Sequence, residues 1–115
     1  MTVESILEQS ATPPIIILQA DHGSGFYYSF DSLESACLEE RFSPFGAYYL
    51  PGVKPNAIPQ DLTTVNLFRI IFNEYFDAQL PILENRQYYT VGQSLFIGME
   101  EVTDLMGRPC DFSEE

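Results

Sequence analysis

The feature that most constrains the fold is a short apolar run that ends abruptly in polar residues. Ile15-Ile16-Ile17-Leu18 follows Pro13-Pro14 and is rich in β-branched side chains, which is typical of a strand. Because apolar and polar residues do not alternate, the run predicts a strand over residues 15–20 that is buried on both faces, as in parallel sheets. The character of the chain then changes within one residue to Asp21-His22-Gly23.

Asp21 and His22 are the candidate metal ligands of this sequence. In open α/β sheets, ligands bind at the carboxyl ends of the strands, which is where these two residues are expected. A carboxylate beside an imidazole suits Zn or Mn. Gly23 and Gly25 are expected to let the backbone turn sharply, so that both side chains can face the same way. The alternative is structural, with Asp21 capping a turn and His22 as a polar residue at the start of a loop.

The rest of the chain predicts a mixture of helices and strands. The clearest helix is Leu62–Phe76, with Asp61 as its N-cap and an apolar, largely aromatic stripe that should be heavily buried. Weaker patterns indicate further helices at residues 3–9 and 32–40, strands at 42–50, 87–91 and 94–97, and a segment at 101–106 that fits either.

Length and charge limit the classes of protein to consider. A chain of 115 residues predicts a single domain over residues 1–115, with an acidic, frayed tail at 109–115. The net charge of −12 disfavours binding to nucleic acid or to anionic lipid. The chain shows neither a signal peptide nor an apolar run approaching the ~20 residues of a membrane span, and the sequence leaves its localisation open.

For the other potentially reactive residues we expect neither a catalytic nor a metal-binding role. Cys37 and Cys110 lack metal-ligand or CxxC spacing and are expected to be free thiols unless the fold brings them together. Ser24 is not expected to act as a nucleophile, because the chain has no GxSxG elbow. Arg41 follows two glutamates and is expected to pair with them. The acidic cluster Glu100, Glu101 and Asp104 is interpreted as a solvated face rather than a cation site.

Three segments in a fixed order carry a resemblance to a known family. They are Ile15–Gly23, Glu40–Gly52 and Thr63–Asn73, and the similarity continues through Arg86–Tyr89 and Val102–Asp104. Together they resemble the C-terminal part of sulfatase-like hydrolases and transferases of the alkaline phosphatase superfamily. The resemblance implies an α/β fold that is part of a three-layer αβα architecture, with a small mixed sheet. It also implies that Asp21 and His22 ligate the active-site metal.

The resemblance further implies metal-dependent hydrolysis or transfer at sulfate or phosphate esters, with a Ser, Thr or formylglycine nucleophile. In the family, that nucleophile and the other acidic ligands precede the Asp-His-Gly segment, whereas here only twenty residues precede Asp21. We therefore assign no catalytic residue. We expect a fragment that is inactive alone and binds its metal weakly or not at all.

Two kinds of partner follow from this interpretation. The chain is expected to pair with the missing N-terminal part of the enzyme or with a second copy of itself. The competing function is a non-catalytic binding or assembly module that forms a homodimer.

Overall fold

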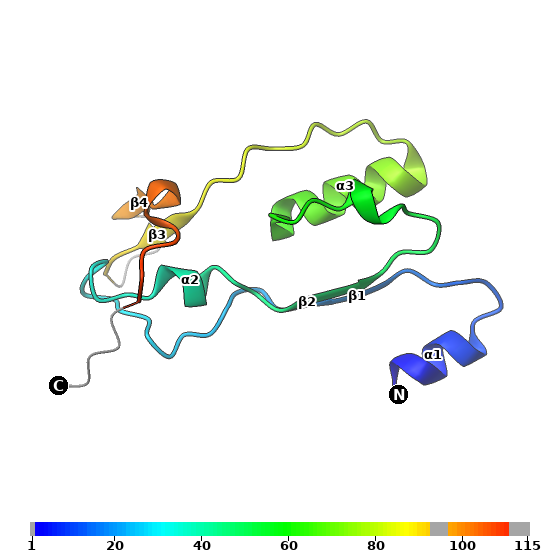
Figure 1. The fold of residues 1–115 in the computed structure, drawn as a ribbon, viewed down its shortest axis with the longest axis horizontal. Helices are drawn as coiled ribbons and strands as arrows, with labels where there is room; N and C mark the ends of the chain where they lie inside the picture. Colours follow the sequence, from blue (N-terminus) through cyan, green and yellow to red (C-terminus); the bar gives the residue numbers. More distant parts are fainter. Residues whose placement is uncertain (1, 93–96, 111–115) are drawn as a thin grey trace. The chain divides into compact units, whose positions relative to one another are not determined.

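The computed structural model describes residues 2–92 and 97–110, whose helices and strands are drawn in Figure 1. The chain divides into two compact units. The first unit comprises Met1–Gln19 and Gly46–Leu83, and the second comprises Ala20–Phe45 and Glu84–Glu115. Helices and small sheets occur together, which confirms the α/β class. Both sheets in the described part of the chain are antiparallel pairs, whereas a mixed sheet was expected. A single domain over residues 1–115 stays a prediction.

The first unit begins with a helix and a two-stranded sheet. Helix α1, Val3–Gln9, is confirmed as predicted, and Thr2 caps it through a reciprocal pair of hydrogen bonds with Ser5. Strand β1, Ile16–Gln19, pairs with β2, Gly46–Tyr49, in the antiparallel sense. Both strands lie where the sequence predicts them.

The predicted burial of the first strand on both faces is wrong for the described structure. Ile16 and Ile17 in β1 are only half-buried, and Leu18 is 45% exposed. The reason is the pairing: β1 joins one short antiparallel strand rather than the interior of a parallel sheet, and two strands leave a face open to solvent. An all-apolar run therefore marks the strand without specifying what covers it.

Helix α3, Thr64–Phe76, is the longest element and confirms the predicted helix. Thr63, not Asp61, occupies the N-cap position, so the predicted cap is wrong. The helix ends at Asp77, whose φ of 50° breaks the helical path.

Only one side of α3 is buried, so the prediction of a heavily buried aromatic stripe is also wrong. Its buried residues are Asn66, Leu67, Ile70 and Ile71. The opposite side is exposed, from Val65 at 60% to Phe76 at 67%. We call the exposed residues the α3 aromatic face, which consists of Val65, Phe68, Phe72 and Phe76. Residues three and four positions apart share one side of a helix, which is why these four lie together.

Two asparagines fasten α3 to the segment that follows it. The Asn66 side chain donates to the Leu83 carbonyl at 2.8 Å and accepts from the Leu83 N–H at 3.0 Å. Asn73, two turns later, does the same with Leu80, at 2.9 and 2.7 Å. The extended segment at 80–83 thus receives from side chains the hydrogen bonds that a neighbouring strand would supply. In the preceding loop, η1, Pro55–Ala57, forms a single 3₁₀ turn.

The second unit contains α2, Leu38–Arg41, and the antiparallel pair β3, Tyr88–Thr90, with β4, Met99–Glu101. Helix formation in the predicted 32–40 segment is thus confined to its end, and 101–106 includes the 3₁₀ turn η2, Thr103–Leu105. Residues 94–96 of one predicted strand, and 111–115 of the predicted frayed tail, lie outside the described residues. The core of this unit is formed by Leu38, Tyr89 and Val102.

A disulfide bond joins Cys37 to Cys110, so the expectation of free thiols is wrong. The two cysteines are 73 residues apart in the sequence, and the fold brings their Cα atoms to 5.0 Å. Cys37 immediately precedes α2, and the bond ties the residues after η2 to that point. No local pattern could indicate this pairing, because it depends on how the second unit closes.

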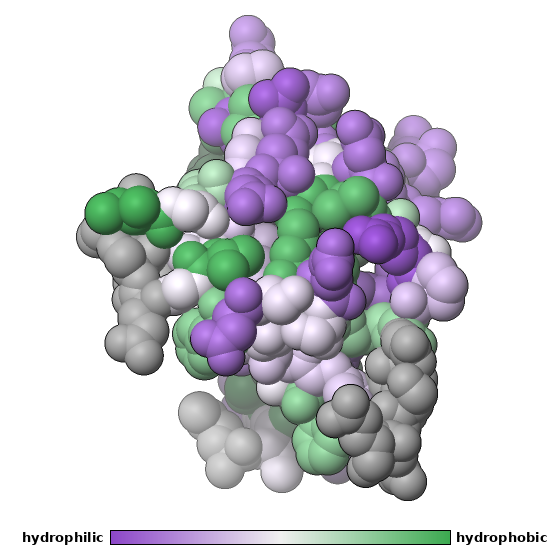
Figure 2. Space-filling model, turned by 90° about the vertical axis from the view of Figure 1, so that its left-hand side faces the viewer, coloured by the Kyte–Doolittle hydropathy of each residue, from purple (hydrophilic) through white to green (hydrophobic). Residues whose placement is uncertain are grey.

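Apolar side chains reach the surface in several places between polar ones on the face drawn in Figure 2. None of the helices in residues 2–92 and 97–110 combines the length and the apolar character needed to cross a bilayer.

Candidate functional site

Asp21 and His22 lie two and three residues beyond the end of β1, as the sequence predicts. The Ala20 N–H donates to the Phe45 carbonyl at 2.9 Å, just before the chain turns away. The Asp21 carboxylate oxygen Oδ1 is 3.7 Å from His22 Nε2. The side chain of Asp21 is 88% exposed and that of His22 is 48% exposed, so both are accessible from solvent.

Gly23 is required at its position by a close approach of backbone. Its N–H donates to the Arg41 carbonyl at 2.8 Å. A Cβ atom at residue 23 would collide with the carbonyl oxygens of Glu40 and Arg41. Gly23 is not among the glycines with positive φ, so space rather than a left-handed turn explains the residue. The backbone at the end of α2 therefore packs directly against Gly23, next to Asp21 and His22.

Glu40 fixes the loop that follows Gly23. Its carboxylate accepts from the Phe26 N–H at 3.2 Å through Oε1 and from the Tyr27 N–H at 3.1 Å through Oε2. A hydrogen bond from the Ser24 side chain, together with these two backbone bonds, lowers the pKa of the Glu40 carboxyl. No local pattern in the sequence indicates this role, because the partners lie 13 and 14 residues away.

Arg41 approaches His22 rather than the neighbouring glutamates, so the predicted pairing is wrong. Its Nη1 atom is 2.7 Å from His22 Nδ1. The guanidinium also stacks on the Tyr28 ring, with its central carbon 4.9 Å from the ring centroid. The loop and α2 thus place a cation directly beside one of the two candidate ligands.

The Asp21-His22 pair fits two positions of a divalent-metal site. A tetrahedral ion with bonds of about 2.1 Å holds its ligand atoms about 3.4 Å apart, close to the observed 3.7 Å. His22 Nδ1 lies 2.6 Å from the Gly23 carbonyl, the kind of backbone partner that orients metal-binding histidines. Within residues 2–92 and 97–110, no group of three His, Cys, Asp or Glu side chains is arranged to hold a metal. The pair by itself would supply only two ligands to such an ion.

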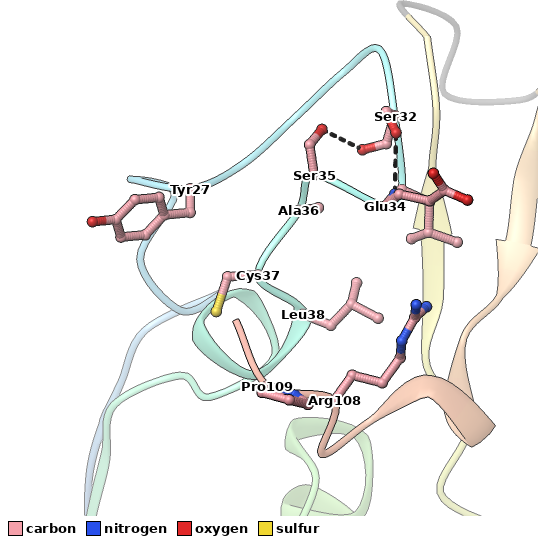
Figure 3. A pocket seen from close by; sticks show the side chains of 10 residues that line it. Tyr27, Ser32, Glu34, Ser35, Ala36, Cys37, Leu38, Arg108 and Pro109 are labelled. Carbon is pink, nitrogen blue, oxygen red and sulfur yellow. Dashed lines mark hydrogen bonds between the residues drawn. The ribbon is translucent and has the colours of Figure 1, made fainter. Parts of the chain in front are cut away.

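A separate pocket of about 630 Å³ lies beside the disulfide in the second unit (Figure 3). Ser35 Oγ donates to the Ser32 carbonyl at 3.2 Å along its wall, and Arg108 supplies one positive charge. Asp21 and His22 are not among its lining residues. The pocket and the candidate ligand pair are therefore different features of this unit.

Comparisons with models of protein families, with curated proteins and with solved structures gave no match.

Proposed function

We propose that Asp21 and His22 form part of a divalent-metal site in a sulfatase-like hydrolase or transferase of the alkaline phosphatase superfamily. In this proposal the chain corresponds to the C-terminal part of the catalytic domain and contributes to a three-layer αβα architecture. The observation that carries it is the 3.7 Å separation of Asp21 Oδ1 and His22 Nε2 directly after β1. The ordered series of sequence segments that resembles this family supports it.

Each residue around the pair has a role in this proposal. Asp21 and His22 would hold a Zn²⁺ or Mn²⁺ ion, which when bound stabilises negative charge on a phosphoryl or sulfuryl group. Gly23 and Glu40 fix the loop on which the ligands are mounted. We place the nucleophile and the remaining ligands on a separate polypeptide segment.

Calorimetric titration of the purified chain with Zn²⁺ and with Mn²⁺ tests the metal site. We expect weak 1:1 binding that is lost in His22→Ala and in Asp21→Asn. Asp31→Asn is the matched control, because it removes the same charge from a residue outside the pair. Binding that is equal in all four proteins would refute the site. Tight binding that His22→Ala abolishes would instead show that the chain supplies a complete ligand set.

Activity assays test the proposed division of the catalytic groups. Because the covalent step depends on a nucleophile that we place elsewhere, the purified chain should not hydrolyse aryl phosphates or aryl sulfates. Turnover that persists through purification and disappears in Asp21→Asn would contradict this assignment.

A second candidate function is a non-catalytic module that assembles as a homodimer. The α3 aromatic face favours it, because four large apolar side chains on one side of a helix are exposed. Contiguous apolar surface of this kind is typical of sites where proteins associate.

A further inference from the structure

His22 Nδ1 has two close neighbours, and they require opposite protonation states of this nitrogen. Arg41 Nη1 lies 2.7 Å away, and the Gly23 carbonyl oxygen lies 2.6 Å away. A guanidinium only donates, so Arg41 needs a lone pair on Nδ1. A carbonyl only accepts, so Gly23 needs a proton there. A neutral imidazole can satisfy one of these neighbours at a time.

Of these two contacts, the one between Arg41 and His22 indicates an attractive interaction. The Gly23 carbonyl belongs to the adjacent residue, so the covalent chain holds it close to the ring. Arg41 lies 19 positions away in the sequence, so no adjacent peptide bond holds its guanidinium against the ring. Hydrogen bonds from a charged donor are also about twice as strong as those between neutral groups.

The position of Asp21 agrees with this assignment. When Nδ1 accepts from Arg41, the ring proton is on Nε2, and that nitrogen faces the Asp21 carboxylate at 3.7 Å. A metal ion at the same place would need the Nε2 lone pair instead. The tautomer that Arg41 favours is therefore the one that does not bind a metal through Nε2.

We propose that Arg41 is a positioning residue that holds His22 in the Nε2–H tautomer and thereby sets the affinity of the Asp21-His22 pair for a divalent metal. The part that concerns the metal rests on the proposed function. For Nε2 to bind, Arg41 releases Nδ1, one proton leaves Nε2 for water, and one from water joins Nδ1. The Gly23 carbonyl then accepts the Nδ1–H, and the free ring is neutral before and after the exchange.

His22 is the sole histidine, so its ring nitrogens can be observed without overlap. In a two-dimensional ¹⁵N–¹H spectrum of the chain at about pH 8, where a free imidazole is neutral, the wild type should show the Nε2–H pattern. Arg41→Met should shift the population toward Nδ1–H, whereas Arg86→Met should not. Arg86 serves as the control because it carries the same charge and contacts Glu84 and Glu101. A wild type in the Nδ1–H form would overturn the proposal without any variant.

Titration with Zn²⁺ alone tests the second part of the proposal, the control of metal affinity by Arg41. Because the lost hydrogen bond is charge-assisted, Arg41→Met should bind Zn²⁺ at least about tenfold more tightly than the wild type, and Arg86→Met should bind about as the wild type does. Equal affinity of all three proteins would overturn the control of affinity by Arg41. Absence of Zn²⁺ binding in all three would refute the proposed metal site, while the nitrogen spectra would still decide the tautomer.

Discussion

At the scale of single residues, Gly23 is the position where the structure tolerates a side chain least. Gly23→Ala would force a Cβ against two backbone carbonyls, which cannot rotate away. We expect a loss of about 1–3 kcal/mol in the free energy of unfolding, measured by urea denaturation. Gly25→Ala is the control, because a Cβ there meets only ordinary contacts. Equal stability of the two variants would contradict the close approach.

The Glu40 carboxylate predicts that the stability of the loop after Gly23 depends on pH. Its pKa lies below the ordinary value of 4.5, so its contribution to the folded loop is present above that value and is lost as the pH falls through the lowered pKa. The protection of the Phe26 and Tyr27 amides against hydrogen exchange, taken relative to the intrinsic exchange rate at each pH, should fall on acidification. It should be low already at neutral pH in Glu40→Gln, which replaces one accepting oxygen with a donor. Glu39→Gln should leave both amides protected. Unchanged exchange in Glu40→Gln would show that the carboxylate does not hold the loop.

The position of Asp21 and His22 just after a strand was predictable from the sequence, whereas their surroundings were not. Asp21 and His22 stand out because the chain changes from apolar to polar at the end of a strand, and this signal is local. Arg41 and Glu40 reach the same loop from a helix, through contacts between residues 13 to 19 positions apart. Nothing at residues 40 and 41 themselves indicates which carbonyl, amide or ring they will contact.

At the scale of elements, the positions of β1 and α3 were predictable and their environments were not. Strand and helix formation depend on neighbouring residues, which the pattern of apolar side chains records. Burial depends on what packs against an element. The all-apolar run at 15–18 indicates cover on both faces, and the described structure pairs it with only one strand.

The α3 aromatic face predicts self-association. Phe72 and Phe76 lie side by side, with ring centroids 6.0 Å apart. If a second copy covers them, each ring would bury about 100 Å² more, which contributes about 2–3 kcal/mol. Light scattering at micromolar concentration should therefore show a dimer for the wild type.

The double variant Phe72→Ser and Phe76→Ser should be monomeric under the same conditions. Phe26→Ser, which removes an exposed aromatic ring from the loop between β1 and α2, should remain dimeric. A monomeric wild type would exclude the homodimer.

At the scale of the whole molecule, the Cys37–Cys110 bond is the contact that spans the longest stretch of sequence described above. Cross-linking a loop of 73 residues restricts the unfolded chain, and we expect its loss to lower the free energy of unfolding by about 2–4 kcal/mol. Urea denaturation of the double variant Cys37→Ser and Cys110→Ser measures this. Added reductant should destabilise the wild type to the same degree and should leave the variant unchanged. A wild type that is insensitive to reductant would contradict the bond.

The same bond turns residues 37–110 into a closed covalent ring, within which the whole of the stretch Gly46–Leu83 is contained. A protease that cuts one peptide bond anywhere inside that ring opens the circle but releases no piece. The nicked molecule therefore migrates as a single species on a gel until the sulfur–sulfur link is reduced, and only then separates into two fragments. Cleavage in the loop between β2 and α3 would go unnoticed in any assay that omits a reductant.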